Sequence, residues 1–218
     1  MIQQDELKTI QSEIHENSIV FDVGANRGDW GIEILKLDRG CNLFCFEPNE
    51  KIIRELNANL SIYSNKFKII NSGLSREELS LDYYDYENFN ELSSFNRRLN
   101  VEQSLGLGVP NIKSLKCSTL DKFCELNGID FIDFLKVDTE GHELDVLLGS
   151  ENLLSKGKIS KIQFEYGGTY IDSGITLKQV FELLQKYDFK IFKLGEDREL
   201  SYSENLENFQ YSNFLAKL

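Results

Sequence analysis

The stretch VFDVGANRGDW, residues 20–30, places an apolar run directly before two glycines. The run has the composition of a buried β-strand, and an amphipathic helical pattern begins after it. Asp22 stands near the end of the run, and Gly24 and Gly28 lie in the turn that follows. Glycine accepts backbone angles that other residues avoid and lets the backbone come close to a ligand. The stretch therefore predicts a strand, a tight turn and a helix beside a binding site.

Strand and helix patterns alternate on both sides of this turn, after a helical lead-in over residues 1–17. Such alternation predicts a doubly wound, Rossmann-like α/β sheet of seven mostly parallel strands, with the last two strands antiparallel at one edge. We find no repeat and no linker, so residues 1–218 are expected to form a single domain. The strands of the predicted sheet lie at 19–23, 42–47, 67–70, 131–138, 158–166, 189–194 and 211–218.

Composition narrows the class of partner. Lys and Arg total 24 against 36 for Asp and Glu, and the net charge of -12 repels polyanions, so no nucleic-acid partner is expected. The four cysteines contain no Cys-x-x-Cys pair and are expected to be buried thiols of a reducing compartment. We see neither a signal peptide nor an apolar stretch long enough for a membrane span. A cytoplasmic protein is expected, and its oligomeric state stays open.

Glu47 ends the second predicted strand, 19 positions after Gly28. A carboxylate at that place can accept hydrogen bonds from both hydroxyls of a ribose. A dinucleotide fingerprint would continue with glycines where this chain has Asn26 and Asp29, so a pyrophosphate site is poorly supported. An acidic residue ahead of the turn, here Asp22, suits a nucleoside that carries an amino group and a sulfonium. These residues predict S-adenosylmethionine as the cofactor.

Several longer motifs resemble the FkbM-type S-adenosylmethionine-dependent methyltransferases, over about residues 18–194. They are VFDVGANRGDW, FCFEPNEKIIRELNAN, STLDKF, IDFLKVDTEGHELDVLLGS and IQFEY. The resemblance implies a methyltransferase sheet and methyl transfer, commonly to an oxygen of a sugar or similar polyol acceptor. It also implies roles for residues at the matching positions: the cofactor's methionine part would lie among Asp22, Gly24, Asn26 and Gly28, its ribose at Glu47, and its adenine beside Asn71 to Gly73.

The motif DTEGHE, residues 138–143, follows a predicted strand and is expected to lie beside the glycine turn. Methyl transfer needs an aligned acceptor and often a base that removes the acceptor's proton. We expect Asp138 to contact the cofactor amine or the acceptor, Glu140 to orient an acceptor hydroxyl, and His142 to serve as a base near neutral pH. Glu165 ends the next predicted parallel strand and is expected to face the same crevice.

Each of these residues also has a purely structural interpretation. Asp138 could cap the following helix, Glu140 could complement the helix dipole, and His142 could point to solvent. Glu165 could pair with a neighbouring cation. Asp138, Glu165 and His142 could bind a hard cation such as Mg²⁺, but no dense ligand pattern demands one, and no metal is predicted.

Residues 74–117 interrupt the regular alternation. Short strands predicted at 78–84 and 112–117 flank a polar loop over 85–111 that is rich in tyrosine and asparagine. Long loops in compact domains often carry function, and aromatic faces beside amides and hydroxyls suit carbohydrates. We expect this inserted hairpin and loop on the side of a small-molecule or saccharide acceptor.

Two other functions stay open at this point. A nicotinamide-dependent oxidoreductase would share the sheet and the acidic ribose ligand, although it lacks the pyrophosphate glycines here. A non-catalytic domain that retains the methyltransferase fold is the second alternative.

Overall fold

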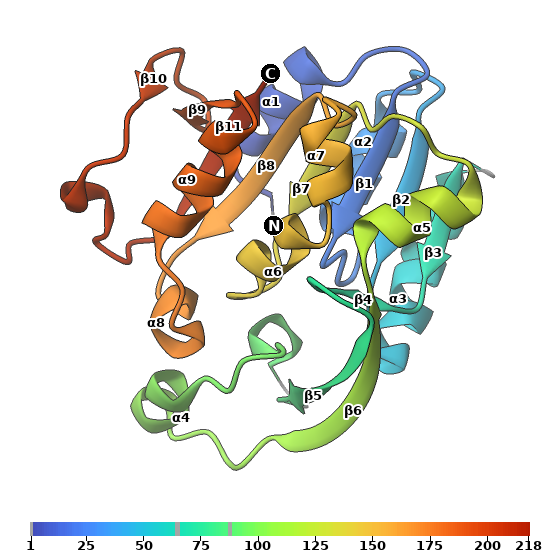
Figure 1. Ribbon diagram of the computed structural model, residues 1–218. Coiled ribbons are helices and arrows are strands. Elements are labelled where there is room, and N and C mark those ends of the chain that lie inside the picture. The colour runs from blue at the N-terminus through green and yellow to red at the C-terminus, as the bar shows by residue number, and fades with distance from the viewer. Residues whose placement is uncertain (1, 64–65, 87–88) are drawn as a thin grey trace.

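The computed structural model describes residues 2–63, 66–86 and 89–218, and its centre is an eight-stranded sheet with helices on both faces (Figure 1). The strand order is β10-β9-β11-β8-β7-β1-β2-β3, and β1, β2, β3, β7 and β8 are parallel. The strands of this sheet are β1 (Ile19–Val23), β2 (Asn42–Phe46), β3 (Phe67–Ile70), β7 (Phe134–Val137), β8 (Lys161–Tyr166), β9 (Lys190–Lys193), β10 (Glu199–Leu200) and β11 (Ser212–Lys217).

The predicted Rossmann-like α/β fold is confirmed, with one correction at one end of the sheet. The two-residue β10 adds an eighth strand to the seven predicted. The last two predicted strands, β9 and β11, pair antiparallel at this end of the sheet, as predicted, and β11 lies between β8 and β9. The central residues of β11 are buried on both faces, as in an interior strand of a sheet.

Buried side chains form one apolar cluster on each face of the sheet, because successive strand residues point in opposite directions. Phe21 belongs to the cluster that includes residues of α5, α6, α7 and α9. Val20 belongs to the cluster that includes residues of α1, α2 and α3. All four cysteines are buried free thiols, as predicted. The helices outside the insertion are α1 (Gln4–Glu13), α2 (Asp29–Lys36), α3 (Glu50–Leu60), α5 (Leu120–Asn127), α6 (Glu143–Leu148), α7 (Glu151–Ser155), α8 (Thr169–Ser173) and α9 (Leu177–Lys186), with short 3₁₀ turns at Ser61–Tyr63 and Glu204–Leu206.

Residues 74–117, which we call the insertion, form a smaller unit beside the carboxyl ends of the parallel strands. The predicted hairpin is present as β5 (Leu79–Asp85) paired antiparallel with β6 (Asn111–Ser118), and β4 (Gly73–Leu74) pairs with the end of β6. The region predicted as a loop over 85–111 contains a 3₁₀ turn at Asn90–Leu92 and helix α4 (Leu99–Leu105), while residues 87–88 lie outside the described ranges. Figure 1 shows the curved hairpin extending away from the main sheet, with α4 on the side of α8.

None of the helices within the described ranges is long and apolar enough to cross a membrane.

Candidate active site

The glycine turn brings the ends of β1 and β7 into direct contact. Gly24 has φ +81°, and a Cβ atom built on it would lie 1.9 Å from the carbonyl oxygen of Asp138. Gly28 has φ +86°, and its Cβ would lie 2.6 Å from Leu56 Cδ1 of α3. Gly24 is therefore required where two strand ends meet, whereas Gly28 is required by its backbone angle and by helix packing.

Glu47 is buried at the end of β2 and links this strand to the glycine turn and to the start of α3. Its carboxylate accepts the backbone N–H of Asn26 at 3.1 Å and that of Asn49 at 2.8 Å. Burial raises the pKa of Glu47 to about 7, although these two N–H donors oppose the rise. Asn71 braces the same turn, because its side-chain amide donates to the backbone oxygens of Glu47 and Pro48 at 3.3 and 3.1 Å.

Two cavities adjoin the glycine turn and share Gly24, Asn26 and Asp138 in their walls. The first has a volume of about 60 Å³ and is lined by Glu47 and Gly73, together with side chains of the insertion that include Tyr83 and Phe95. A Cβ on Gly73 would come within 2.7 Å of the Phe95 ring, so the insertion closes tightly over this cavity. The second has a volume of about 400 Å³, and Trp30 and Lys136 are among its lining residues.

The residues at the turn fit a nucleoside with an amino-acid end. Asn26 Oδ1 and Trp30 Nε1 are buried, and neither has a hydrogen-bond partner among the described residues. Buried polar atoms in native proteins are nearly always paired, so two unpaired ones beside a cavity indicate a polar ligand. Glu47 in the neighbouring cavity wall supplies the carboxylate that a ribose would need.

Asp22 has a different place from the one that the resemblance implies. Its carboxylate is fully buried in β1, lies 3.5 Å from Lys136 Nζ, and is not among the residues that line the two cavities. Burial raises the pKa of Asp22, and the Lys136 charge opposes that rise. Asp22 therefore stabilises the positive charge of Lys136 and lines neither of the two cavities.

Lys136 is a site residue that sequence reasoning missed. It is buried in β7, and its Nζ lies 2.8 Å from Asp138 Oδ2. Burial alone would lower the pKa of Lys136, but the carboxylates of Asp138 and Asp22 outweigh it and raise the pKa. The available signal was a lysine inside the apolar run FLKV, where a charge is rarely placed without buried partners.

Asp138, Glu140 and Glu165 come together at the ends of β7 and β8, as predicted. One carboxylate oxygen from each lies within 4.8 Å of the others, so the three could hold a cation. Burial raises the pKa of Glu140 to about 8, with Asp138 adding to the rise and Arg98 opposing it. Burial and the charges of Asp138 and Glu140 also raise the pKa of Glu165 well above its usual range. The absence of a metal stays a prediction.

His142 does not join these carboxylates, and it does not point to solvent either. Its Nε2 lies 3.1 Å from Ser75 Oγ, its Nδ1 lies 3.4 Å from Asp145, and its ring packs against Phe95. Burial lowers the pKa of His142, and Asp145 opposes that shift.

The turn after β7, residues 138–142, is held by Glu143, another residue that the sequence analysis missed. Its buried carboxylate accepts the N–H groups of Thr139 at 2.7 Å and Gly141 at 3.0 Å.

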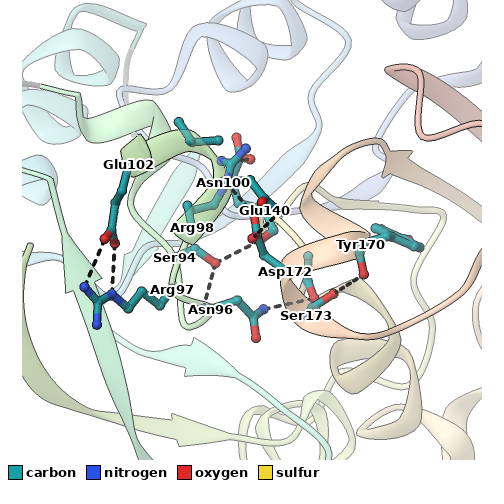
Figure 2. Close-up of polar contacts among 12 residues, drawn as sticks. Ser94, Asn96, Arg97, Arg98, Asn100, Glu102, Glu140, Tyr170, Asp172 and Ser173 are labelled. Carbon is teal, nitrogen blue, oxygen red and sulfur yellow. Dashed lines mark hydrogen bonds and ion pairs between the residues drawn. The ribbon is translucent and has the colours of Figure 1, made fainter. Parts of the chain in front are cut away.

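The insertion is fastened to this turn and to α8 (Figure 2). Arg98, only 8% exposed, lies 2.8 Å from Glu140 through Nη1 and 3.8 Å from Asp172 through Nε. Ser94 Oγ donates to the Glu140 carbonyl at 2.9 Å, and Asn96 donates to the Gly141 carbonyl at 3.0 Å. Glu140 has φ +56°, an angle that costs energy outside glycine, and these contacts hold it there.

Comparison with known proteins bears on the family of the chain. The family model described as "Methyltransferase FkbM domain" matches residues 22–191. The chain is 21% identical over 178 residues to the 2-O-methyltransferase NoeI of Sinorhizobium fredii, which covers 78% of this chain and 72% of that protein. It is 25% identical over 199 residues to the hexuronic acid methyltransferase AglP of Haloferax volcanii, covering 90% and 74%.

Solved structures show the same fold at low identity. Aeropyrum pernix fibrillarin, solved with S-adenosylmethionine, superposes with a TM-score of 0.52 at 10% identity, over 94% of this chain and 68% of that one. A Streptococcus mutans protein solved with S-adenosylhomocysteine gives a TM-score of 0.52 at 11% identity, over 100% and 99%. Because the family model spans most of the sequence, the chain belongs to the FkbM methyltransferase family and is an S-adenosylmethionine-dependent methyltransferase.

Proposed function

We propose that this enzyme methylates a hydroxyl of a saccharide or of a similar small-molecule acceptor. One observation carries the proposal: Asp138 borders both cavities at the glycine turn and also lies with Glu140 and Glu165 in one carboxylate cluster. Grouped carboxylates can orient a hydroxyl and take its proton. Two relatives whose names describe a 2-O-methyltransferase and a hexuronic acid methyltransferase support an oxygen acceptor on a sugar.

The residues of the site would have separate roles in the reaction. Glu47 would hold the ribose of S-adenosylmethionine, while Gly24 and Asn26 would border its methionine part. The cofactor, when bound, supplies an electrophilic methyl group on its sulfonium. Desolvation and neighbouring carboxylates raise the pKa of Glu140 to about 8 and raise that of Glu165 well above its usual range, so each is a stronger base than a free carboxylate once it is ionised. Residues of the insertion line the smaller cavity together with Asp138, and the insertion would exclude water from the reaction there.

Calorimetric titration with S-adenosylmethionine and S-adenosylhomocysteine tests the cofactor assignment. We expect both to bind, because the fold, Glu47 and the unpaired atoms at the turn all fit them. NADH, added in a parallel fluorescence titration, is expected not to bind. If NADH binds and neither sulfur nucleoside does, the result favours a nicotinamide-dependent oxidoreductase. If none of the three ligands binds, the result favours a non-catalytic domain. Transfer of a labelled methyl group to a panel of neutral, amino and acidic sugars then tests the acceptor class.

We also propose that the insertion forms the acceptor side of the site and is held there by Arg98. Arg98→Met would leave Glu140 and Asp172 without their shared cation. Glu140 is partly exposed and the Asp172 contact is long. We therefore expect the free energy needed to detach the insertion from α8 and from the turn after β7 to fall by only about 1–2 kcal/mol. Hydrogen exchange of residues 94–105 should then accelerate by roughly tenfold.

Arg97→Met is the matched control for this prediction. Arg97 precedes Arg98 but pairs with Glu102 inside the insertion and has a side chain 40% exposed, so its loss should change exchange little. Equal acceleration in the two variants would show that Arg98 has no special part in docking the insertion.

A further inference from the structure

The insertion carries a concentration of exposed apolar side chains. Twelve large hydrophobic side chains are exposed in the described part of the chain, and five of them lie between residues 89 and 112: Phe89, Leu99, Leu105, Val109 and Ile112. Helix α4 buries none of its seven residues, all of which the structure describes. A short helix in water is normally stabilised by packing one apolar face against the rest of the protein. α4 has no such buried face.

Four apolar residues lie in the part of the insertion that projects away from the main sheet (Figure 1). We call them the apolar tip: Phe89, Leu105, Leu107 and Val109. Three of the four, Phe89, Leu107 and Val109, line one hollow of about 260 Å³. Val109 is 81% exposed, and a Cβ atom on Gly106 or Gly108 would meet nothing within 4 Å. The loop between α4 and β6 therefore projects into open space.

The apolar tip has almost no charge, although the chain as a whole is strongly acidic. Glu102 is the one charged residue between residues 99 and 112, and it pairs with Arg97 and accepts a hydrogen bond from the Tyr86 hydroxyl. Asp85 lines the same hollow, but its carboxylate pairs with Lys113 at 2.5 Å. The net charge of the whole chain is -12. A partner of the tip is therefore recognised by apolar contact and not by charge.

The size and composition of the tip favour a lipid surface over a second protein chain. Its side chains expose on the order of a few hundred Å² of apolar surface, whereas a stable protein complex buries about 800 Å² on each partner. The centre of a protein interface is also rich in tyrosine, tryptophan and arginine. The tip instead joins leucine, valine and phenylalanine to two glycines on a projecting loop. Apolar side chains on such a projection can enter the boundary between lipid headgroups and acyl chains.

We propose that the apolar tip docks this enzyme reversibly on a neutral lipid surface. Phe89, Leu105 and Val109 would enter that surface, because they are the most exposed members of the tip. The net charge of -12 would keep the enzyme away from anionic lipids.

Docking would also bring the proposed acceptor side close to the lipid. α4 begins beside that side, because Arg98 contacts Glu140 at 2.8 Å and Asn100 donates to Asp172 of α8 at 3.3 Å. A saccharide carried by a lipid would then lie within reach of the site. This consequence rests on the proposed function, whereas the docking itself does not.

Flotation with lipid vesicles tests the docking without cofactor or acceptor. We expect the unaltered enzyme to float with phosphatidylcholine vesicles. It should float less when a third of the lipid is phosphatidylserine, because its net charge repels an anionic surface. Val109→Glu and Leu105→Glu each place a carboxylate in the tip and should lower partition onto phosphatidylcholine at least tenfold.

Leu126→Glu is the matched control. Leu126 is 73% exposed, but it lies on α5, outside the insertion. Its replacement adds the same charge to an exposed apolar position and should leave flotation unchanged. Sedimentation velocity of the same proteins without vesicles reports their oligomeric state.

Flotation that the two tip variants lose and the control keeps supports the inference. Absence of flotation, a preference for phosphatidylserine, or the same behaviour in the tip variants and the control overturns it. A dimer of the unaltered enzyme that Val109→Glu dissociates also overturns it, because the tip would then bind a second copy of the chain. None of these outcomes changes cofactor binding, so the proposed function is judged separately by the calorimetric titration.

Discussion

Replacing Glu47 with alanine is expected to weaken S-adenosylmethionine binding by at least a hundredfold. A carboxylate that accepts two ribose hydroxyls makes two charge-assisted hydrogen bonds, each contributing about 1.5–3 kcal/mol. The variant also frees the N–H groups of Asn26 and Asn49, which Glu47 now holds at 3.1 and 2.8 Å. Both losses act on the same ligand because Asn26 lines the cavity that Glu47 lines. Calorimetry measures the change, and unchanged affinity would show that the ribose assignment is wrong.

The pH dependence of binding gives a second measure of the same carboxylate. Burial raises the pKa of Glu47 to about 7, so the free enzyme holds this group protonated below that pH. The ribose hydroxyls donate to the ionised form, and binding must then release the proton. Affinity should therefore fall as pH drops through 7, by about tenfold for each further pH unit. It should level off above pH 8.

Glu47→Gln is the control for this pH effect. The amide keeps the shape of the side chain and one oxygen acceptor, but it has no proton to lose. The variant should bind more weakly than the unaltered enzyme at pH 8, and its affinity should no longer fall between pH 7 and 6. A pH profile that persists in Glu47→Gln would assign the titration to another group.

The parallel part of the fold could be predicted from the sequence because local pattern and burial agree there. The strands at 19–23, 42–47 and 67–70 read as apolar runs, since both of their faces are covered by helices. β10 could not be predicted in this way, because Glu199–Leu200 is only two residues long and is a strand only through its pairing with β9. The position of β11 is likewise set by which neighbours it meets, and its own residues carry no sign of that.

Site residues that follow the ends of strands could be predicted from the sequence. Site residues whose position depends on contacts with distant parts of the chain could not. Asp138, Glu140 and Glu165 end neighbouring parallel strands, and topology alone brings them to one edge. His142 was placed with them by sequence proximity, but the turn rotates its ring toward Ser75. Arg98 lies 42 positions before Glu140, in a region of weak periodicity, so no local pattern could join the two.

Gly24→Ala is expected to be the most destabilising single change at the site. Alanine at φ +81° costs about 1–2 kcal/mol for the backbone angle alone. The new methyl group would also lie 1.9 Å from the Asp138 carbonyl oxygen, which is backbone and cannot turn away. The ends of β1 and β7 must then separate, although the N–H of Asp138 donates to the carbonyl of Val23 at 3.0 Å. We expect a total loss above about 4 kcal/mol in the free energy of unfolding.

Gly128→Ala separates the two causes of this loss. Gly128 ends α5 at φ +64°, but a Cβ there would meet nothing within 4 Å. That variant should therefore lose only the 1–2 kcal/mol or so of the backbone angle, and it should bind S-adenosylhomocysteine normally because α5 lies outside the cavity walls. Urea unfolding of both variants measures the difference. Equal losses would mean that β1 and β7 do not meet at Gly24, and the two cavities that share this glycine would then lose their common wall.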